Sequence, residues 1–282
     1  MKVLSSPEEI YAQLDFARRQ GKRIGLVPTM GALHDGHLSL VREAKRDCEI
    51  AVTTIFVNPS QFGPNEDFAK YPRTLDSDLE KLASVGCDFV FVPSKDHMYP
   101  LGHTTFVEPP AVATNWEGKI RPGHFRGVTT IVLKLFNMLP AHVAYFGRKD
   151  YQQVAVISAM VRDLNVPILI QPCETIREPD GLAMSSRNRY LSATERVRAL
   201  GLRHALSKAQ SMIDDGHRNV AQIESAMHDV LNKAPVDSID YAAIVDPDTM
   251  EQRSDLGSPA VAIIAVRVGT TRLIDNSLLR IQ

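Results

Sequence analysis

The strongest constraint on the fold is an alternation of short apolar runs with amphipathic segments, which continues to about residue 172. The apolar runs are rich in β-branched residues and predict strands over 24–27, 50–57, 89–92, 143–146 and 168–170. The segments between them show helical periodicity from about residue 37 and over 76–85, 127–139 and 150–164. Such alternation predicts a parallel sheet with helices on both faces. Ligands of these sheets bind beyond the carboxyl ends of the strands, so residues that follow each run are the first candidates for a site.

The pattern changes in the last third of the chain. Ser192 and Glu195 form a capping-box pair that predicts a helix reaching about Asp214, and a second amphipathic helix is expected over 219–233. Strand-like runs follow at 241–245, 261–268 and around 273–274. Helices followed by strands indicate a small α+β unit. We therefore expect an α/β protein with a Rossmann-like parallel-sheet domain over residues 1–176 and a smaller α+β domain over 177–282.

Composition and charge restrict the class of protein. Hydrophobic residues make up 44% and charged residues 23% of the chain, and the net charge of -1 offers no basic field for nucleic acid. Cys48, Cys87 and Cys173 form no CxxC pair, which disfavours both a zinc ribbon and a disulfide framework. The N-terminus lacks the apolar core of a signal peptide, and no apolar run approaches the roughly 20 residues that span a bilayer. We expect a soluble, cytoplasmic protein without nucleic-acid or membrane partners.

Residues 28–37 form the most suggestive segment, because they lie between a predicted strand and a predicted helix. Gly31 and Gly36 permit close approach of a ligand to the backbone. The N–H groups and the dipole at a helix N-terminus favour phosphate, and His34 and His37 are spaced to donate hydrogen bonds to one phosphate group. A turn with two surface histidines is the alternative. Zinc is disfavoured, because no further ligands occur at a recognisable spacing.

Two other segments that follow predicted strands carry groups suited to a phosphate or a carboxylic acid. In residues 146–153, Lys149 supplies a compact positive charge, and Gln153 supplies an amide that both donates and accepts. Asn58 and Gln61 place polar groups after the second predicted strand, at the expected rim of the sheet. The alternative for each segment is a solvated polar loop without a ligand.

Two further groups of side chains could bind ions. Ser185, Ser186 and Arg187 form a set that binds oxyanions, at the predicted domain junction where a mobile lid would be useful. A plain charged linker is the alternative there. Asp76 and Asp78 could hold magnesium through water, or they are acids favoured in the first turn of a helix by its dipole.

Taken together, these segments resemble the pantothenate synthetase family. Residues 28–37 resemble that family's form of the HxGH nucleotidylyl-transfer signature, 146–153 its second motif and 180–191 its counterpart of the KMSKS loop. Residues 56–62 and 71–73 match as well, and the likeness runs from the first strand into the C-terminal domain. HxGH alone indicates only the superfamily, whereas the combination is specific to this family.

The resemblance implies an ATP-dependent ligase that requires magnesium and forms a homodimer. (R)-Pantoate and β-alanine would condense to pantothenate through a pantoyl-adenylate, with release of AMP and diphosphate. Two other functions remain open, namely another HxGH-type adenylyltransferase and a nucleotide-binding module without turnover.

The resemblance also implies the residues of the site. The catalytic groups would be His34, His37, Lys149, Ser185, Ser186 and Arg187. The ATP site would be lined by Thr29, Met30, Gly31, Ala32, Leu33, His34, Asp35, Gly36, His37, Gly147, Arg148, Lys149, Asp150, Ile176, Met184, Ser185, Ser186 and Arg187. The other two substrates would contact Pro28, Asn58, Gln61, Tyr71, Arg121 and Gln153. Asp78 corresponds to a family acid near magnesium, with Ser77 beside it, and the side chain of Arg148 is expected to point away from ATP.

Overall fold

The computed structural model describes residues 1–64, 66, 68–257 and 259–281, and the chain divides into two compact units. These are Met1–Gly147 with Val156–Cys173, and Arg148–Ala155 with Glu174–Gln282. The sequence placed one boundary near residue 176, whereas the second unit also takes up residues 148–155. The physical reason is Asn276, whose side-chain amide donates to the carbonyl oxygens of Arg148 and Lys149, each at 2.8 Å.

Within the described residues, the first unit is built on a 6-stranded parallel sheet in the order β1-β4-β3-β2-β5-β6. The strands are β1 (Lys2–Leu4), β2 (Ile24–Thr29), β3 (Ile50–Ile55), β4 (Phe89–Phe91), β5 (Val143–Gly147) and β6 (Leu169–Cys173). Every position of β3 is buried, as expected for a strand covered on both faces. The predicted parallel sheet is confirmed. Strand β1 was not predicted, because its 3 residues are too few to show a period.

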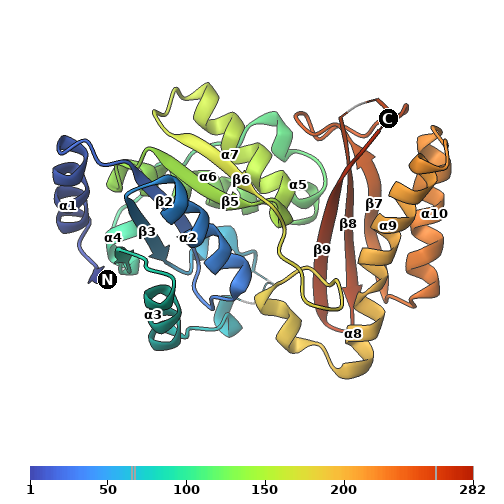
Figure 1. The fold of residues 1–282 in the computed structure, drawn as a ribbon, viewed down its shortest axis with the longest axis horizontal. Helices are drawn as coiled ribbons and strands as arrows, with labels where there is room; N and C mark the ends of the chain where they lie inside the picture. The colour runs from blue at the N-terminus through green and yellow to red at the C-terminus, as the bar shows by residue number, and fades with distance from the viewer. Residues whose placement is uncertain (65, 67, 258, 282) are drawn as a thin grey trace. The chain divides into compact units, whose positions relative to one another are not determined.

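Helices cover both faces of this sheet (Figure 1). They are α1 (Pro7–Arg19), α2 (Asp35–Asp47), α3 (Leu75–Ser84), α4 (Lys95–Met98), α5 (Glu117–Ile120), α6 (His124–Met138) and α7 (Tyr151–Asp163). The connection from β1 to β2 runs along the sheet in the opposite direction to that from β2 to β3, so right-handed crossovers place α1 and α2 on opposite faces. Accordingly, α2 packs beside α3, and α1 packs beside α6. Among the described residues, no helix is both long and apolar enough to cross a membrane.

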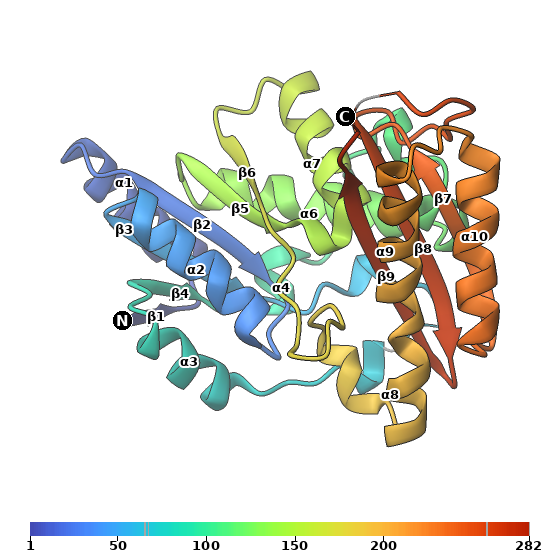
Figure 2. The same cartoon turned by 45° about the vertical axis from the view of Figure 1, so that its right-hand side comes forward.

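The second unit combines helices with an antiparallel sheet. Its elements are α8 (Ala193–Ala199), α9 (Gly201–Asp214), α10 (Val220–Lys233), β7 (Ser238–Val245), β8 (Ala260–Val268) and β9 (Thr271–Leu279). Helices α9 and α10 pack on each other and against the sheet (Figure 2). The single helix predicted up to Asp214 is wrong, since the chain divides at Leu200 into α8 and α9. Glycine disfavours helix continuity, and Gly201 lies so near Ala234 that an added Cβ would be 2.5 Å from the alanine Cβ.

Candidate active site

Strand β2 leads into a tight turn, and α2 begins directly after it. Pro28 and Thr29 belong to the strand, which therefore ends later than predicted. Gly31 adopts a left-handed conformation with φ of 84°, which glycine reaches at little cost. His34 is the N-cap of α2, so the helix begins at Asp35 and not near residue 37 as predicted. Both histidines consequently lie at the first turn of this helix.

The two imidazole rings lie together, with their centroids 4.1 Å apart. Nδ1 of His34 accepts a hydrogen bond from the N–H of Gly36 at 3.2 Å, and Nδ1 of His37 accepts one from the N–H of His34 at 3.4 Å. A neutral imidazole has one accepting and one donating nitrogen, so each ring must then carry its proton on Nε2. Paired Nε2–H donors at a helix N-terminus suit binding of phosphate oxygens.

A buried carboxylate holds this turn in place. Asp78 on α3 is 0% exposed, and its two oxygens accept hydrogen bonds from the N–H groups of Ala32 at 2.9 Å and Leu33 at 2.8 Å. The hydroxyl of Thr74 donates to the same carboxylate at 3.2 Å. Ala32 has φ of 51°, a conformation that is strained for alanine. Asp78 therefore fixes the backbone immediately before His34.

This arrangement does not fit the expected metal role of Asp78. Its carboxylate is buried and already receives those three donors, whereas a magnesium ligand must turn an oxygen toward the ion. Asp76 is exposed on the same helix. No group of three or more His, Cys, Asp or Glu side chains in the described part of the chain could hold a metal ion. These contacts support a structural role for Asp78, and its position near magnesium remains a prediction.

Gln61 lies at the end of a short 3-10 helix, η1 (Pro59–Gln61), that follows β3. Its side-chain nitrogen donates to Sδ of Met30 at 3.0 Å, and its side-chain oxygen accepts from the amide of Asn58 at 3.1 Å. Asn58 is 1% exposed, donates to the carbonyl of Gly127 at 3.1 Å and accepts from the hydroxyl of Tyr99 at 2.7 Å. Gln61 and Met30 are thus adjacent, and Asn58 supports Gln61. A substrate contact of Asn58 remains a prediction.

A substitution at Gly127 tests how tightly this segment is packed. A Cβ added there would lie 2.3 Å from the carbonyl oxygen of Ser60 and 2.6 Å from Cα of Gln61. We expect Gly127→Ala to lower the free energy of unfolding by about 1–3 kcal/mol, the usual effect of overpacking, because backbone must move. Urea denaturation measures this change. Gly147→Ala is the control, since an added Cβ meets nothing within 4 Å there. Equal stability of the Gly127 variant and the wild type would contradict the close packing.

Two other residues expected at the substrate pocket are held by neighbouring side chains. Arg121 forms a bidentate ion pair with Glu66, with N–O distances of 2.7 and 2.8 Å. Its Nη1 also lies 3.1 Å from Nε2 of His124. Tyr71 is 6% exposed and packs edge-on against Phe62, with ring centroids 5.8 Å apart. Their substrate contacts remain predictions.

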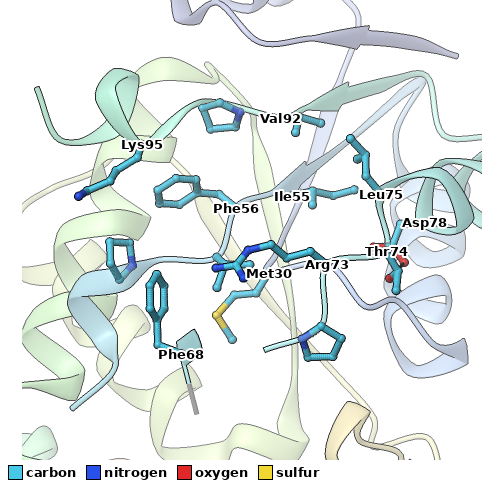
Figure 3. A pocket seen from close by; sticks show the side chains of 15 residues that line it. Met30, Ile55, Phe56, Phe68, Arg73, Thr74, Leu75, Asp78, Val92 and Lys95 are labelled. Carbon is cyan, nitrogen blue, oxygen red and sulfur yellow. Dashed lines mark hydrogen bonds between the residues drawn. The ribbon is translucent and has the colours of Figure 1, made fainter. Parts of the chain in front are cut away.

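A cavity of about 450 Å³ adjoins the histidine turn (Figure 3). Its lining is largely apolar and consists of Met30, Gly31, Ile55, Phe56, Val57, Pro59, Phe68, Pro72, Arg73, Thr74, Leu75, Asp78, Val92, Pro93 and Lys95. In Figure 3 the side chain of Arg73 extends across the cavity near Met30, with Phe56 and Ile55 above it. Such a volume is within the range of small-molecule sites. Met30 lines this cavity and also contacts Gln61, so the cavity and the amide are neighbours.

In the second unit, the predicted phosphate-binding residues of the second motif begin a helix. Lys149 and Asp150 lie on η4 (Arg148–Asp150), with their charged groups 3.9 Å apart, and α7 follows. The side chain of Lys149 retains 21% exposure. Arg148 forms an ion pair with Glu174. Gln153 is half-buried in the first turn of α7. The roles of these side chains toward ATP and pantoate remain predictions.

The third motif, residues 180–191, lies in a loop of the second unit that is closed by a backbone hydrogen bond. The N–H of Met184 donates to the carbonyl oxygen of Ile176 at 3.0 Å, so these two predicted ATP-site residues are neighbours. Ser185 is the N-cap of η5 (Ser186–Tyr190), and its hydroxyl accepts from the N–H of Arg187 at 3.2 Å. The two serines and the arginine therefore lie on one turn, as a shared oxyanion site requires.

Sequence reasoning missed the side chains that anchor this loop. Arg177 forms a bidentate pair with Asp275 of β9, at 2.6 and 2.9 Å. Asn188 is 8% exposed and donates to Glu178 at 2.6 Å and to the carbonyl oxygen of Ala183 at 3.0 Å. The partners of Arg177 are remote in sequence, so no local pattern could have identified them.

The parallel sheet, the left-handed turn after β2 and the paired histidines at a helix N-terminus define a nucleotide-binding α/β protein. A family model described as "Pantoate-beta-alanine ligase" matches residues 2–278. The chain therefore belongs to the pantoate-β-alanine ligase family.

Individual relatives and solved structures agree with this assignment. The chain is 53% identical over 279 residues to a "Pantothenate synthetase" of Rhodopirellula baltica, covering 98% of each chain. It is 49% identical to a "Pantothenate synthetase" of Geobacter sulfurreducens, covering 99% of each. A crystal structure of pantothenate synthetase from Thermus thermophilus has a TM-score of 0.93 and 43% identity, covering 98% of this chain and 99% of that one. A pantoate-β-alanine ligase from Francisella tularensis, complexed with "Beta-gamma ATP and Beta-alanine", has a TM-score of 0.81 and 35% identity, covering 99% and 97%.

Proposed function

We propose that this chain is an AMP-forming ligase that condenses (R)-pantoate with β-alanine and converts ATP to AMP and diphosphate. The observation that carries the proposal is the pair of imidazoles at the start of α2, with their centroids 4.1 Å apart. Both rings use Nδ1 as an acceptor, which leaves the Nε2 proton as the donor. Membership of the pantoate-β-alanine ligase family supplies the substrates.

The first step forms the mixed anhydride. A carboxylate oxygen of pantoate attacks the α-phosphorus of ATP, the bond from that phosphorus to the diphosphate oxygen breaks, and pantoyl-adenylate remains. Since no protein nucleophile is required, positioning and charge stabilisation supply most of the rate. His34 and His37 donate hydrogen bonds from their Nε2–H groups to the phosphate oxygens, and His37 is the donor to the diphosphate that leaves. The remaining phosphate charge is neutralised by Lys149, Ser185, Ser186 and Arg187.

The second step forms the amide. The unprotonated amine of β-alanine attacks the carbonyl carbon of the adenylate, the carbon–oxygen bond to phosphate breaks, and AMP leaves as the amine loses a proton. Gln61 and Gln153 hold pantoate during both steps. Water must be excluded, because it would hydrolyse the anhydride. The apolar lining of the cavity beside Met30 favours that exclusion.

Magnesium belongs to this proposal as an ion carried by the ATP phosphates. The described residues include no cluster of three or more His, Cys, Asp or Glu side chains that could hold a metal. Magnesium in nucleotide sites is commonly bound by one or two carboxylates together with the substrate phosphates. We further propose a cytoplasmic homodimer, on the family resemblance alone. Sedimentation at micromolar concentration checks the dimer, and a monomer mass would contradict it.

An assay with omitted substrates tests the proposed function. We expect diphosphate release from ATP when pantoate is added, and AMP release with sustained turnover only when β-alanine is also present. Another adenylyltransferase would form its nucleotidyl product without any response to β-alanine. A nucleotide-binding module would bind ATP but release no diphosphate with pantoate or any other acid. Either of these results would contradict the proposal.

A further inference from the structure

We propose that His124 is a positioning residue for Gln61, because its ring connects the Glu66–Arg121 ion pair to the backbone of Gln61. The reaction steps above make no use of this histidine. His124 would fix the position from which the side-chain amide of Gln61 binds the acid substrate. The identity of that substrate as pantoate rests on the proposed function.

The geometry around the ring defines its tautomer. His124 begins α6 and is 8% exposed. Its Nδ1 lies 2.8 Å from the carbonyl oxygen of Gln61, which can only accept, so Nδ1 must carry a proton. Its Nε2 lies 3.1 Å from Nη1 of Arg121, which can only donate, so Nε2 must be without a proton. Only the neutral Nδ1–H tautomer satisfies both contacts.

The charges that face the ring agree with a neutral form. Burial lowers the pKa of His124 to about 4, and the positive charge of Arg121 acts in the same direction. The carboxylates of Glu66 and Glu117 act in the opposite direction, as does the bond to Gln61, but they do not outweigh burial. At neutral pH the ring is therefore uncharged and can act as a fixed connector.

The two ends of Gln61 are held independently. Its side-chain oxygen accepts from Asn58 at 3.1 Å, and its backbone oxygen accepts from His124 at 2.8 Å. Arg121 is oriented in turn by its bidentate pair with Glu66, whose side chain is 25% exposed. A residue that contacts substrate needs such support, because small displacements of a binding group reduce affinity strongly.

Three variants of His124 separate the two ring contacts. The side-chain nitrogen of asparagine can take the place of Nδ1–H as a donor, the side-chain oxygen of glutamine can take the place of Nε2 as an acceptor, and alanine replaces neither. We expect His124→Asn to keep the KM for pantoate within about 3-fold, while His124→Gln and His124→Ala raise it about 10-fold, as loss of one buried hydrogen bond does. The kcat and the KM for ATP should change by less than about 3-fold, since the phosphate-binding groups lie elsewhere.

A second histidine provides the control. His142 accepts a backbone hydrogen bond at 3.0 Å from Ile24, which begins β2 at the end opposite the histidine turn. We expect His142→Ala to leave the KM for pantoate unchanged. Equal KM values for the asparagine and alanine variants of His124, or an equal rise in the KM for ATP, would overturn the positioning role. If those variants do not fold, Glu66→Gln tests the outer end of the network, which is only partly buried. An unchanged KM for pantoate in that variant would overturn the proposal.

A measurement on the wild-type chain keeps this inference separate from the proposed function. ¹⁵N NMR of the imidazole nitrogens, assigned with His124→Asn, should show Nδ1 protonated and Nε2 unprotonated near neutral pH. The opposite tautomer or a doubly protonated ring would overturn the proposal, even in an active enzyme. If the wild-type protein shows the expected tautomer but no activity, the proposed function is contradicted and the hydrogen-bond network around His124 is still supported.

Discussion

Replacement of His37 by alanine is expected to lower kcat by about 100-fold or more, the usual effect of removing one proton-donating or charge-stabilising group. The Nε2–H of His37 is fixed by the hydrogen bond that its Nδ1 accepts from His34 at 3.4 Å. The variant therefore loses a donor that acts as charge shifts onto diphosphate. Steady-state release of AMP at saturating substrates measures the loss.

The matched control for this variant is His37→Gln, whose side-chain nitrogen can occupy the position of Nε2. We expect it to recover part of kcat, because its amide N–H supplies a hydrogen-bond donor in place of the imidazole Nε2–H. ATP binding should be measured in parallel, since alanine also removes a capping contact of about 1 kcal/mol. Near-normal turnover of His37→Ala would remove His37 from the mechanism.

The second large effect is expected from the replacement of Asp78 by alanine. This change should lower both the free energy of unfolding and the affinity for ATP. Ala32 and Leu33 are 1% and 2% exposed, so Asp78→Ala leaves two buried N–H groups without their acceptors. An unsatisfied buried group costs about 1–3 kcal/mol, so we expect the unfolding free energy to fall by about 3 kcal/mol or more. The released turn should also weaken ATP binding. Denaturant unfolding and ATP titration measure the two effects.

Asp78→Asn is the matched variant that distinguishes positioning from metal binding. It keeps one acceptor oxygen and loses the second, so an intermediate loss of stability is expected. If Asp78 only positions the turn, the magnesium concentration that gives half-maximal rate should stay within about 2-fold of wild type. A shift of about 10-fold or more, at unchanged stability, would restore Asp78 as a magnesium residue.

Local patterns were sufficient to predict every strand of the parallel sheet except β1, and most helices. The buried strand β3 is a continuous apolar and β-branched run, and the periodicity of 76–85 corresponds to α3 at Leu75–Ser84. The break at Leu200 was not predictable, because it reflects the contact of Gly201 with Ala234, which is distant in sequence. The assignment of residues 148–155 to the second unit likewise depends on Asn276.

In the candidate site too, some residues could be predicted from local spacing and others could not. The pairing of His34 with His37 was predictable, because a spacing of three residues places both rings at one helix start. The roles of Asp78 and His124 were not, since each acts on backbone atoms far away in the sequence, as their separations of 45 and 63 residues show. Side chains that support a site have no motif of their own, because their partners are chosen by the fold.

A crystal soaked with ATP, magnesium and pantoate, but no amine, tests the central claim most directly. That claim is that the two imidazoles at the start of α2 act together on one phosphoryl group of the nucleotide. We expect electron density for pantoyl-adenylate, with phosphate oxygens about 3 Å from Nε2 of His34 and of His37. A nucleotide whose phosphates lie away from both imidazoles, with pantoate unreacted, would contradict the claim.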